Sequence, residues 1–146
     1  MVLARSTRDI DVLDVAPAPL QILIEAGGKG CPIALKHGVY LDVVTGIVEV
    51  PWNYDERFVP FFEGQFQNLR LYAMDPYDIV LTKIKRSTDR GFGDMLYLAK
   101  SVPLAPDILR DRYEKKWEPY ITGDKREPRF ILHSWIEAIR ESQSQP

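Results

Sequence analysis

The hydrophobic pattern of the chain changes once, at about Asp75, and this change limits the folds that are open to it. Residues 8–73 are rich in Val, Ile, Leu, Tyr and Phe and are punctuated by Gly and Pro, which is typical of short strands joined by loops. From Asp75 onward the apolar residues follow a helical spacing and charged residues become more frequent. No repeat, low-complexity block or long linker divides the chain. We therefore expect one α+β domain over residues 1–146, sheet-rich over 1–74 and helical over 75–141.

The local pattern predicts individual elements within these two parts. Strands are expected over residues 9–13, 39–44, 46–50 and 69–73, and a short helix over residues 18–26. Asp75 and Pro76 are a favourable N-cap and first position for a helix. Its apolar face comprises Tyr77, Val80, Leu81 and Ile84. Gly91 and Gly93 should interrupt the chain before further helices over 94–101, 106–117 and 128–141, and the tail from Ser142 should fray.

Composition excludes several classes of protein. With 45% hydrophobic and 27% charged residues, the 146-residue chain has the profile of an ordinary globular domain rather than a disordered or collagen-like one. The formal net charge of −2 excludes a uniformly basic surface that binds nucleic acid, but it is compatible with a local basic patch. A single cysteine, Cys31, forms neither an intramolecular disulfide nor a multi-cysteine zinc site. No apolar run approaches the roughly 20 residues that span a bilayer, and the expected location is the cytoplasm.

The strand predicted at Asp9-Ile-Asp-Val-Leu13 carries the sharpest chemical feature. Side chains at i and i+2 share one face of a strand, so Asp9 and Asp11 should point the same way while Ile10 and Val12 face the core. Asp42 lies in the middle of a second predicted strand, where an acid is unfavourable unless it is satisfied or faces solvent. If the two strands are neighbours, three carboxylates converge into a site for Mg²⁺ ions that catalyse phosphoryl or nucleotidyl transfer.

The same acids have a simpler interpretation. Short acidic alternations are common on the solvent side of amphipathic strands, and Asp42 could lie on an exposed edge. The spacing alone favours this structural role over a metal site.

A second feature is the basic run between Lys83 and Asp94. Lys83, Arg86 and Arg90 fall at helical spacings, and a stripe of this kind could neutralise a triphosphate. A solvated helix face, with Asp94 near a helix N-terminus, is the alternative.

Other residues give weaker signals. The Gly27–Gly30 segment lacks the Gly-Lys-Ser/Thr ending of a phosphate loop and favours a flexible turn. His37 and His133 are too far apart for a metal-ligand motif, and Cys31 has no evident partner base. Asp107 and Glu137 are expected on solvated helix faces. Large aromatic residues are expected in the core or between helices, namely Tyr113, Trp117, Trp135 and the Phe61–Phe62 pair.

Taken together, these motifs resemble a family. The segment from Arg5 to Asp11 resembles the R-x-T-x-D-I-D strand of uncharacterised (DUF6036-like) bacterial and archaeal nucleotidyltransferase-like proteins, relatives of the abortive-infection type nucleotidyltransferase toxins. The segment Asp75–Lys83 is similar to their D-x-x-D-L-x-x-x-K helix, and Arg90 with Asp94 to their R-x-x-x-D motif. Leu109–Tyr113 and Glu118–Tyr120 resemble their C-terminal helical signature. The resemblance covers the chain from Arg5 to about Ile139.

The resemblance implies a nucleotidyltransferase-like mixed sheet with flanking helices and a helical C-terminal part. Asp9, Asp11 and Asp42 then match the metal-binding carboxylates, with Asp42 also catalytic. Lys83 and Asp94 match the residues implicated in catalysis, and Lys83, Arg86 and Arg90 those that bind nucleotide. The implied reaction is Mg²⁺- or Mn²⁺-dependent attack of an RNA or protein hydroxyl on the α-phosphate of an NTP. In toxin-like relatives an antitoxin partner is usual.

One departure from the family pattern concerns the triphosphate. Active members carry a Gly-Gly or Gly-Ser turn roughly ten or more residues before the first aspartate, where backbone amides hold the phosphates. Eight residues precede Asp9 here and none of them is glycine. The sequence therefore predicts that an N-terminal strand and helix of the family fold are missing, through a late start or a reduced protein.

This departure leaves three hypotheses. The first is an active nucleotidyltransferase, and the second is a catalytically weakened module that binds nucleotide, RNA or a partner protein. A carboxylate-dependent nuclease is the third. Missing elements would uncover a sheet edge or apolar surface, so a homodimer or a partner-bound state is also expected.

Overall fold

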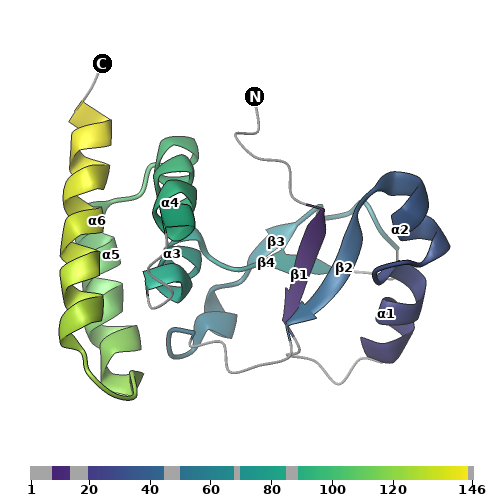
Figure 1. The fold of residues 1–146 in the computed structure, drawn as a ribbon, viewed down its shortest axis with the longest axis horizontal. Coiled ribbons are helices and arrows are strands. Elements are labelled where there is room, and N and C mark those ends of the chain that lie inside the picture. The colour runs from purple at the N-terminus through teal and green to yellow at the C-terminus, as the bar shows by residue number, and fades with distance from the viewer. Residues whose placement is uncertain (1–7, 14–19, 45–49, 68–69, 85–88, 145–146) are drawn as a thin grey trace. The chain divides into compact units, whose positions relative to one another are not determined.

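The computed structural model describes residues 8–13, 20–44, 50–67, 70–84 and 89–144. Within those residues the chain forms two two-stranded sheets and six α-helices, the last of them long, which confirms a mixed α+β architecture (Figure 1). Contacts divide the chain into two compact units, residues 1–48 and 49–146. None of the helices in the described part of the chain is long and apolar enough to cross a membrane.

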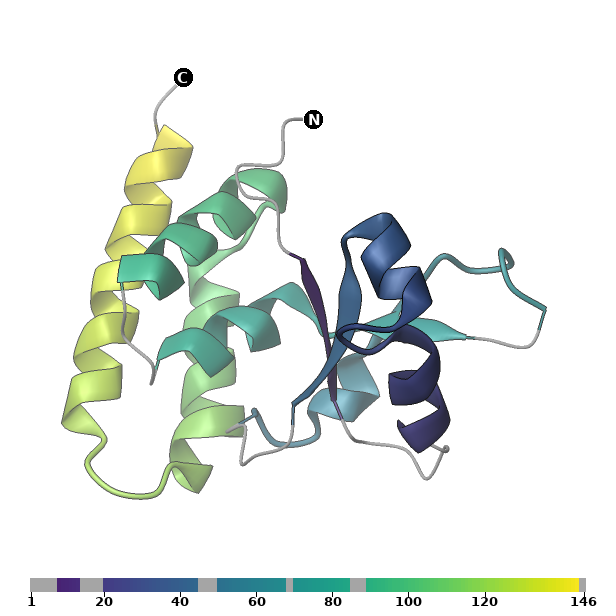
Figure 2. The ribbon, with the colours of Figure 1, turned by 45° about the vertical axis from the view of Figure 1, so that its right-hand side comes forward.

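The first unit is built on a parallel pair of strands, β1 (Asp9–Leu13) and β2 (Tyr40–Val44). Both strands lie where the sequence predicts them, and they run side by side in Figures 1 and 2. Parallel strands need a long crossover connection, and here it contains helices α1 (Leu20–Gly27) and α2 (Pro32–His37). The predicted helix over 18–26 is therefore confirmed for its described residues.

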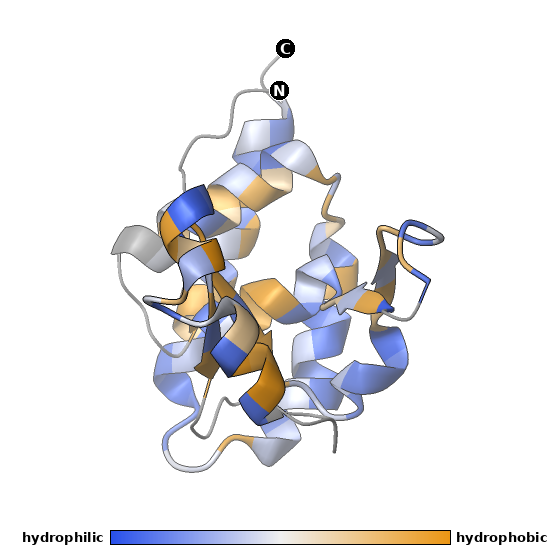
Figure 3. Cartoon of the chain, turned by 90° about the vertical axis from the view of Figure 1, so that its right-hand side faces the viewer, coloured by the Kyte–Doolittle hydropathy of each residue, from blue (hydrophilic) through white to orange (hydrophobic). Residues whose placement is uncertain are grey.

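Helix α1 packs against β2, on the side of the sheet that carries Leu41. A Cβ atom added to Gly27 would lie 2.9 Å from Cδ1 of Leu41, which shows how closely the helix approaches the strand. Ile10 of β1 was expected to face the core, but 52% of its surface is exposed, so that prediction is wrong. Hydrophobic residues predominate along α1 (Figure 3), and Ile22, at 60% exposure, also faces solvent. The two-stranded sheet is thus too narrow to bury all of its apolar side chains.

The second unit begins with a short 3-10 turn, η1 (Tyr54–Arg57), and an antiparallel pair, β3 (Val59–Phe61) and β4 (Leu71–Ala73). Strand β4 confirms the strand predicted over 69–73, whereas residues 46–49 of another predicted strand lie outside the described residues. Phe61 and Phe62 were expected to be packed, but about half of each side chain is exposed, at 51% and 49%. Three-residue strands offer too little surface to cover these rings.

The helical part of the second unit follows the predicted order with different boundaries. Helix α3 (Pro76–Ile84) is capped as expected, because the Asp75 carboxylate accepts a hydrogen bond from the Tyr77 amide at 2.9 Å. Helix α4 (Asp89–Ser101) begins five residues earlier than predicted, so Gly91 and Gly93 lie inside it. Each glycine costs up to about 1 kcal/mol in a helix. The buried Met95 offsets this cost, as does the Phe92 ring, whose centroid lies 6.3 Å from that of Trp135.

The C-terminal elements are longer than predicted. Helix α5 (Pro106–Arg112) continues through a π-helical turn, η2 (Tyr113–Trp117), into a 3-10 turn, η3 (Glu118–Tyr120). Helix α6 (Arg126–Ser144) extends beyond the predicted range at both ends. The expected fraying is wrong up to Ser144, because the Gln143 amide donates a 2.8 Å hydrogen bond to the carbonyl of Leu104.

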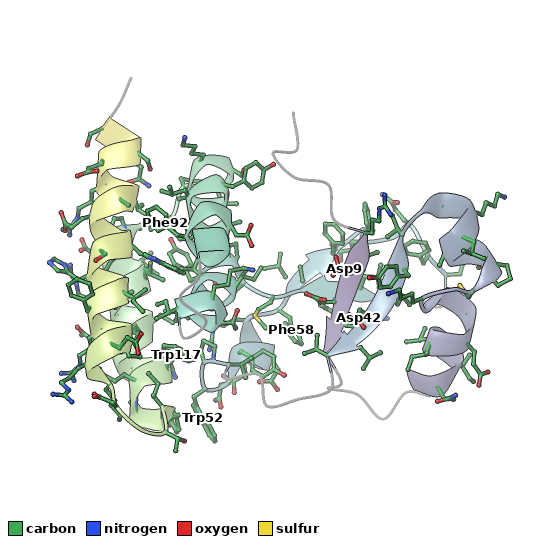
Figure 4. All side chains as sticks on the ribbon, viewed as in Figure 1. Asp9, Asp42, Trp52, Phe58, Phe92 and Trp117 are labelled. Carbon is green, nitrogen blue, oxygen red and sulfur yellow. The ribbon has the colours of Figure 1, made fainter. Side chains whose placement is uncertain are left out.

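These helices enclose the main hydrophobic core. Helices α4 and α5 pack against α6, and α3 packs against all three. Tyr113, Trp117 and Trp135 are buried as predicted, and Trp117 is labelled among the packed helices in Figure 4. The buried cluster comprises Val80, Leu81, Ile84, Met95, Ala99, Leu104, Leu109, Tyr113, Trp117, Ile121, Leu132, Trp135, Ile136 and Ile139.

A polar group interrupts this core beside the π-helical turn. Among the described residues, no group makes a hydrogen bond of normal geometry with the buried Tyr113 hydroxyl, although the Glu118 carboxylate lies close enough to interact with it. Burial, together with the charge of the Glu118 carboxylate, raises the pKa of Tyr113 to about 12. Glu118 itself pairs with the Arg129 guanidinium through two hydrogen bonds, one of them at 3.0 Å, and this pairing lowers the pKa of the carboxyl.

The Glu118→Gln variant is expected to lose stability at neutral pH and to respond less to acid than the wild type. Because folding lowers the pKa of Glu118, its ionised form stabilises the protein above the ordinary glutamate value of 4.5, and this contribution disappears as the pH falls through the lowered value. Urea unfolding at several pH values between neutrality and about pH 3 measures the effect. Glu137→Gln, which removes an exposed pair with Arg140, is the control. Parallel pH profiles for Glu118→Gln and the wild type would contradict the prediction.

Candidate metal centre

The parallel pairing of β1 and β2 brings three aspartates of the first unit together. In the register of the two strands, Asp11 lies directly beside Asp42, and Asp9 lies beside Tyr40. Asp9 and Asp11 are two residues apart, so all three carboxylates share one face of the sheet. One carboxylate oxygen from each residue lies within 4.8 Å of the other two. Figure 4 shows Asp9 and Asp42 on the neighbouring strands.

The donor set suits a hard divalent cation. Mg²⁺ binds oxygen ligands at about 2.0–2.1 Å, so two ligands of one ion lie at most about 4.2 Å apart. The three carboxylate oxygens lie within 4.8 Å of one another, so the side chains must move closer together for all three to hold one ion. Three carboxylates without sulfur or imidazole favour Mg²⁺ or Mn²⁺ over Zn²⁺.

The carboxylates are open to ligands from solution. Asp11 and Asp42 are exposed, and Asp9 is partly buried. Like charges directly opposite each other on paired strands repel, and a cation between them removes this cost. The arrangement leaves room for water and substrate phosphates to complete the coordination of a bound ion.

The second unit contains the other predicted pair of site residues. Lys83, in the last turn of α3, donates a hydrogen bond to the Asp94 carboxylate of α4 at 3.2 Å. Both side chains keep about a third of their surface exposed, at 36% and 33%. This pair connects α3 to α4 and is partly exposed to solvent. Asp107 is also exposed, as predicted.

The basic stripe stays a prediction. Lys83 lies in α3 and the backbone of Arg90 lies in α4, while residues 85–88 between them are outside the described residues. Arg86 and the side chain of Arg90 lie outside the described residues.

An ion-pair network that the sequence patterns do not predict lies at the start of α3. Asp78 is fully buried and accepts hydrogen bonds from Arg57 at 2.8 Å and from Arg112 at 3.2 Å. Arg112 also donates to the Asp75 carboxylate at 2.5 Å. Arg57 further donates to the backbone carbonyl of Asn53 at 2.8 Å. The network therefore joins η1, α3 and α5.

The two aspartates of the Asp75–Lys83 motif, Asp75 and Asp78, are a sequence signal for this network. Asp78 lies three residues before Leu81 and next to Tyr77, on the edge of the predicted apolar face. A buried acid of this kind requires a partner, and Arg112 lies in the motif that resembles the C-terminal signature. Only the fold shows that these two distant motifs contact each other.

The weaker candidates have structural roles or lie on the surface. The Cys31 thiol caps α2, since it accepts a hydrogen bond from the Ala34 amide at 3.3 Å. His37 and His133 are both exposed. Within the described residues, neither histidine belongs to a group of metal-ligating side chains.

Comparison with known proteins identifies the family. The family model described as nucleotidyltransferase of unknown function (DUF6036) matches residues 1–143. The chain belongs to this family. No curated protein and no solved structure matches it. Membership of this nucleotidyltransferase family confirms the resemblance drawn from the motifs and implies a nucleotide substrate.

Proposed function

We propose that this DUF6036 protein is a divalent-metal-dependent nucleotidyltransferase that moves NMP from an NTP to a hydroxyl group of RNA or protein. The convergence of Asp9, Asp11 and Asp42 carries the proposal, since their oxygens lie within 4.8 Å of one another on an open face of paired strands. Family membership supports the reaction type, and it implies the nucleotidyltransferase-like fold.

In the proposed reaction, the acceptor hydroxyl oxygen forms a bond to the α-phosphorus, and the bond between the α-phosphorus and the bridging oxygen breaks. Pyrophosphate leaves with the electrons of that bond. Asp9, Asp11 and Asp42 would hold Mg²⁺ or Mn²⁺, which supplies charge neutralisation at the phosphates and lowers the pKa of the attacking hydroxyl. Asp42 is our candidate for accepting the hydroxyl proton, because it is exposed and central in β2.

Lys83 and Asp94 are proposed to contribute to nucleotide binding and catalysis. The 3.2 Å pairing fixes the position of the Lys83 ammonium, and its partial exposure leaves donors for a phosphate oxygen. Arg86 and Arg90 are proposed as further phosphate ligands on the basis of the motif alone.

The proposal is tested by incubating the full chain with Mg²⁺, each of the four labelled NTPs and either bulk RNA or a protein extract. We expect label in one of the acceptors with the wild type, release of pyrophosphate, and no incorporation with Asp11→Ala. Glu25→Gln, an exposed acid of the same unit, is the matched control and should retain the activity.

The alternative functions give different results in the same experiment. Nucleotide binding without incorporation, equal for wild type and Asp11→Ala, would favour the catalytically weakened binding module. Metal-dependent shortening of the RNA without incorporation would favour a nuclease. The acceptor that becomes labelled identifies the substrate class.

We also propose that the chain functions as a homodimer or with a partner protein, such as an antitoxin. Large apolar side chains of the first unit face solvent, with Leu35 at 76% and Ile33 at 58% exposure. Surfaces of this kind often form interfaces. Sedimentation equilibrium measures the mass, and a monomer across the concentration range would contradict the homodimer.

A further inference from the structure

The turn at Gly27–Gly30, which the proposed function does not use, is held beside the aspartate-bearing sheet. Gly28 directly follows α1, and its amide donates a hydrogen bond to the Ile24 carbonyl at 2.7 Å. The Gly28 backbone also forms a parallel β-bridge with Leu41 of β2. A Cβ atom at Gly28 would lie 2.4 Å from the Ile24 carbonyl oxygen, so only glycine fits there. The turn is thus fixed to the strand that carries Asp42.

The turn has a closed, hydrogen-bonded conformation. The Cys31 amide donates to the Gly28 carbonyl at 3.1 Å, and the intervening Gly30 has a φ of +86°. A bond from residue i+3 to residue i with a positive φ at i+2 is typical of a type II turn. The Cys31 thiol also lies 3.2 Å from the Ala26 carbonyl. Lys29 therefore stands at the second position of a closed turn.

The Lys29 side chain extends to the residue that adjoins the carboxylates. Its ammonium lies over the Tyr40 ring, 5.8 Å from the ring centroid. Tyr40 is the neighbour of Asp9 in the strand register and lies two residues before Asp42, so its ring shares the face of the three carboxylates. A cation on an aromatic ring at an exposed site is held only weakly and keeps its N–H donors for another ligand.

We propose that Lys29 binds the outer phosphates of the nucleoside triphosphate at this site, with the Tyr40 ring in weak contact with its ammonium. This inference rests on the proposed metal-dependent nucleotidyl transfer. Three carboxylates and one divalent cation leave a net charge of −1, so a triphosphate at the site needs further positive charge. As the bond to the α-phosphorus breaks, negative charge grows on the departing pyrophosphate, and the Lys29 ammonium neutralises it. The ligand class is therefore a triphosphate rather than a monophosphate.

The test compares two ligands and three variants of the full chain. Isothermal titration calorimetry with Mg²⁺ measures the affinity for an NTP whose α–β bridging oxygen is replaced by methylene, and for the matching NMP. Mn²⁺ binding is measured separately by electron paramagnetic resonance. Lys29→Ala should weaken triphosphate binding about tenfold, the size expected for one contact to a charged group. Its affinities for NMP and Mn²⁺ should be unchanged.

Matched variants separate a specific contact from a general loss of charge. Lys36→Ala, which removes an exposed lysine from α2 of the same unit, should leave triphosphate affinity unchanged. Lys29→Arg should restore most of the affinity. Equal weakening by Lys29→Ala and Lys36→Ala, or equal weakening for triphosphate and monophosphate, would overturn the inference while leaving the metal centre in place. Failure of the wild type to bind Mn²⁺ would overturn the proposed function, and this inference with it.

Discussion

Replacing Asp11 by asparagine is expected to have opposite effects on the metal-free protein and on its response to metal. Asp11 lies directly beside Asp42 on the paired strands, and removal of one charge relieves their repulsion, so the metal-free variant should be more stable by about 0.5 kcal/mol. In the wild type, free Mn²⁺ at about 100 times its dissociation constant should add about 2.7 kcal/mol to the free energy of unfolding. Asp11→Asn should lose this gain, together with activity.

Urea unfolding with and without Mn²⁺ measures both effects on one protein. Glu25→Gln, which removes an exposed acid outside the strands, should change neither the metal-free stability nor the gain on adding Mn²⁺. A purely structural role for Asp11 would leave the response to Mn²⁺ intact. This result would contradict the metal centre. Unchanged metal-free stability of Asp11→Asn, together with a lost response to Mn²⁺, would contradict only the predicted repulsion between Asp11 and Asp42.

Replacing Asp78 by asparagine is expected to destabilise the protein by about 3 kcal/mol, since it removes one partner of a buried ion-pair network. Asp78 is fully buried, and the Arg57 and Arg112 side chains that bind it are only 19% and 17% exposed. Without the carboxylate, two guanidinium groups lose a charge partner in a region that water reaches poorly. Chemical denaturation followed by circular dichroism and by tryptophan fluorescence measures the loss.

Two further variants make this result specific. Asp107→Asn, at 84% side-chain exposure, should change stability by no more than about 0.5 kcal/mol. Asp75→Asn keeps a side-chain oxygen for the cap of α3, so its cost should reflect the Arg112 contact alone and be smaller than that of Asp78→Asn. Equal effects of Asp78→Asn and Asp107→Asn would show that the network contributes little to stability.

The helices and strands that the sequence predicts correctly depend on interactions between residues close together in the chain. Asp9–Leu13 alternates with the period of a strand, and Asp75-Pro76 begins a helix, because each signal depends on neighbouring residues. The predicted start of α4 after Gly91 and Gly93 is wrong, because the true start depends on contacts between residues far apart in the sequence. Propensity disfavours a helix there, but tertiary contacts of Phe92 and Met95 outweigh it.

The sequence by itself determined the chemical inventory of the candidate site and the family motifs that contain it. The type and spacing of Asp9 and Asp11 were sufficient to place two carboxylates on one strand face, because side-chain alternation is a local property of a strand. Only the tertiary structure placed Asp42 beside Asp11 and Lys29 over Tyr40, and joined Asp78 to Arg57 and Arg112. Strand register and buried ion pairs join residues that are far apart in sequence, and local periodicity carries no information about such contacts.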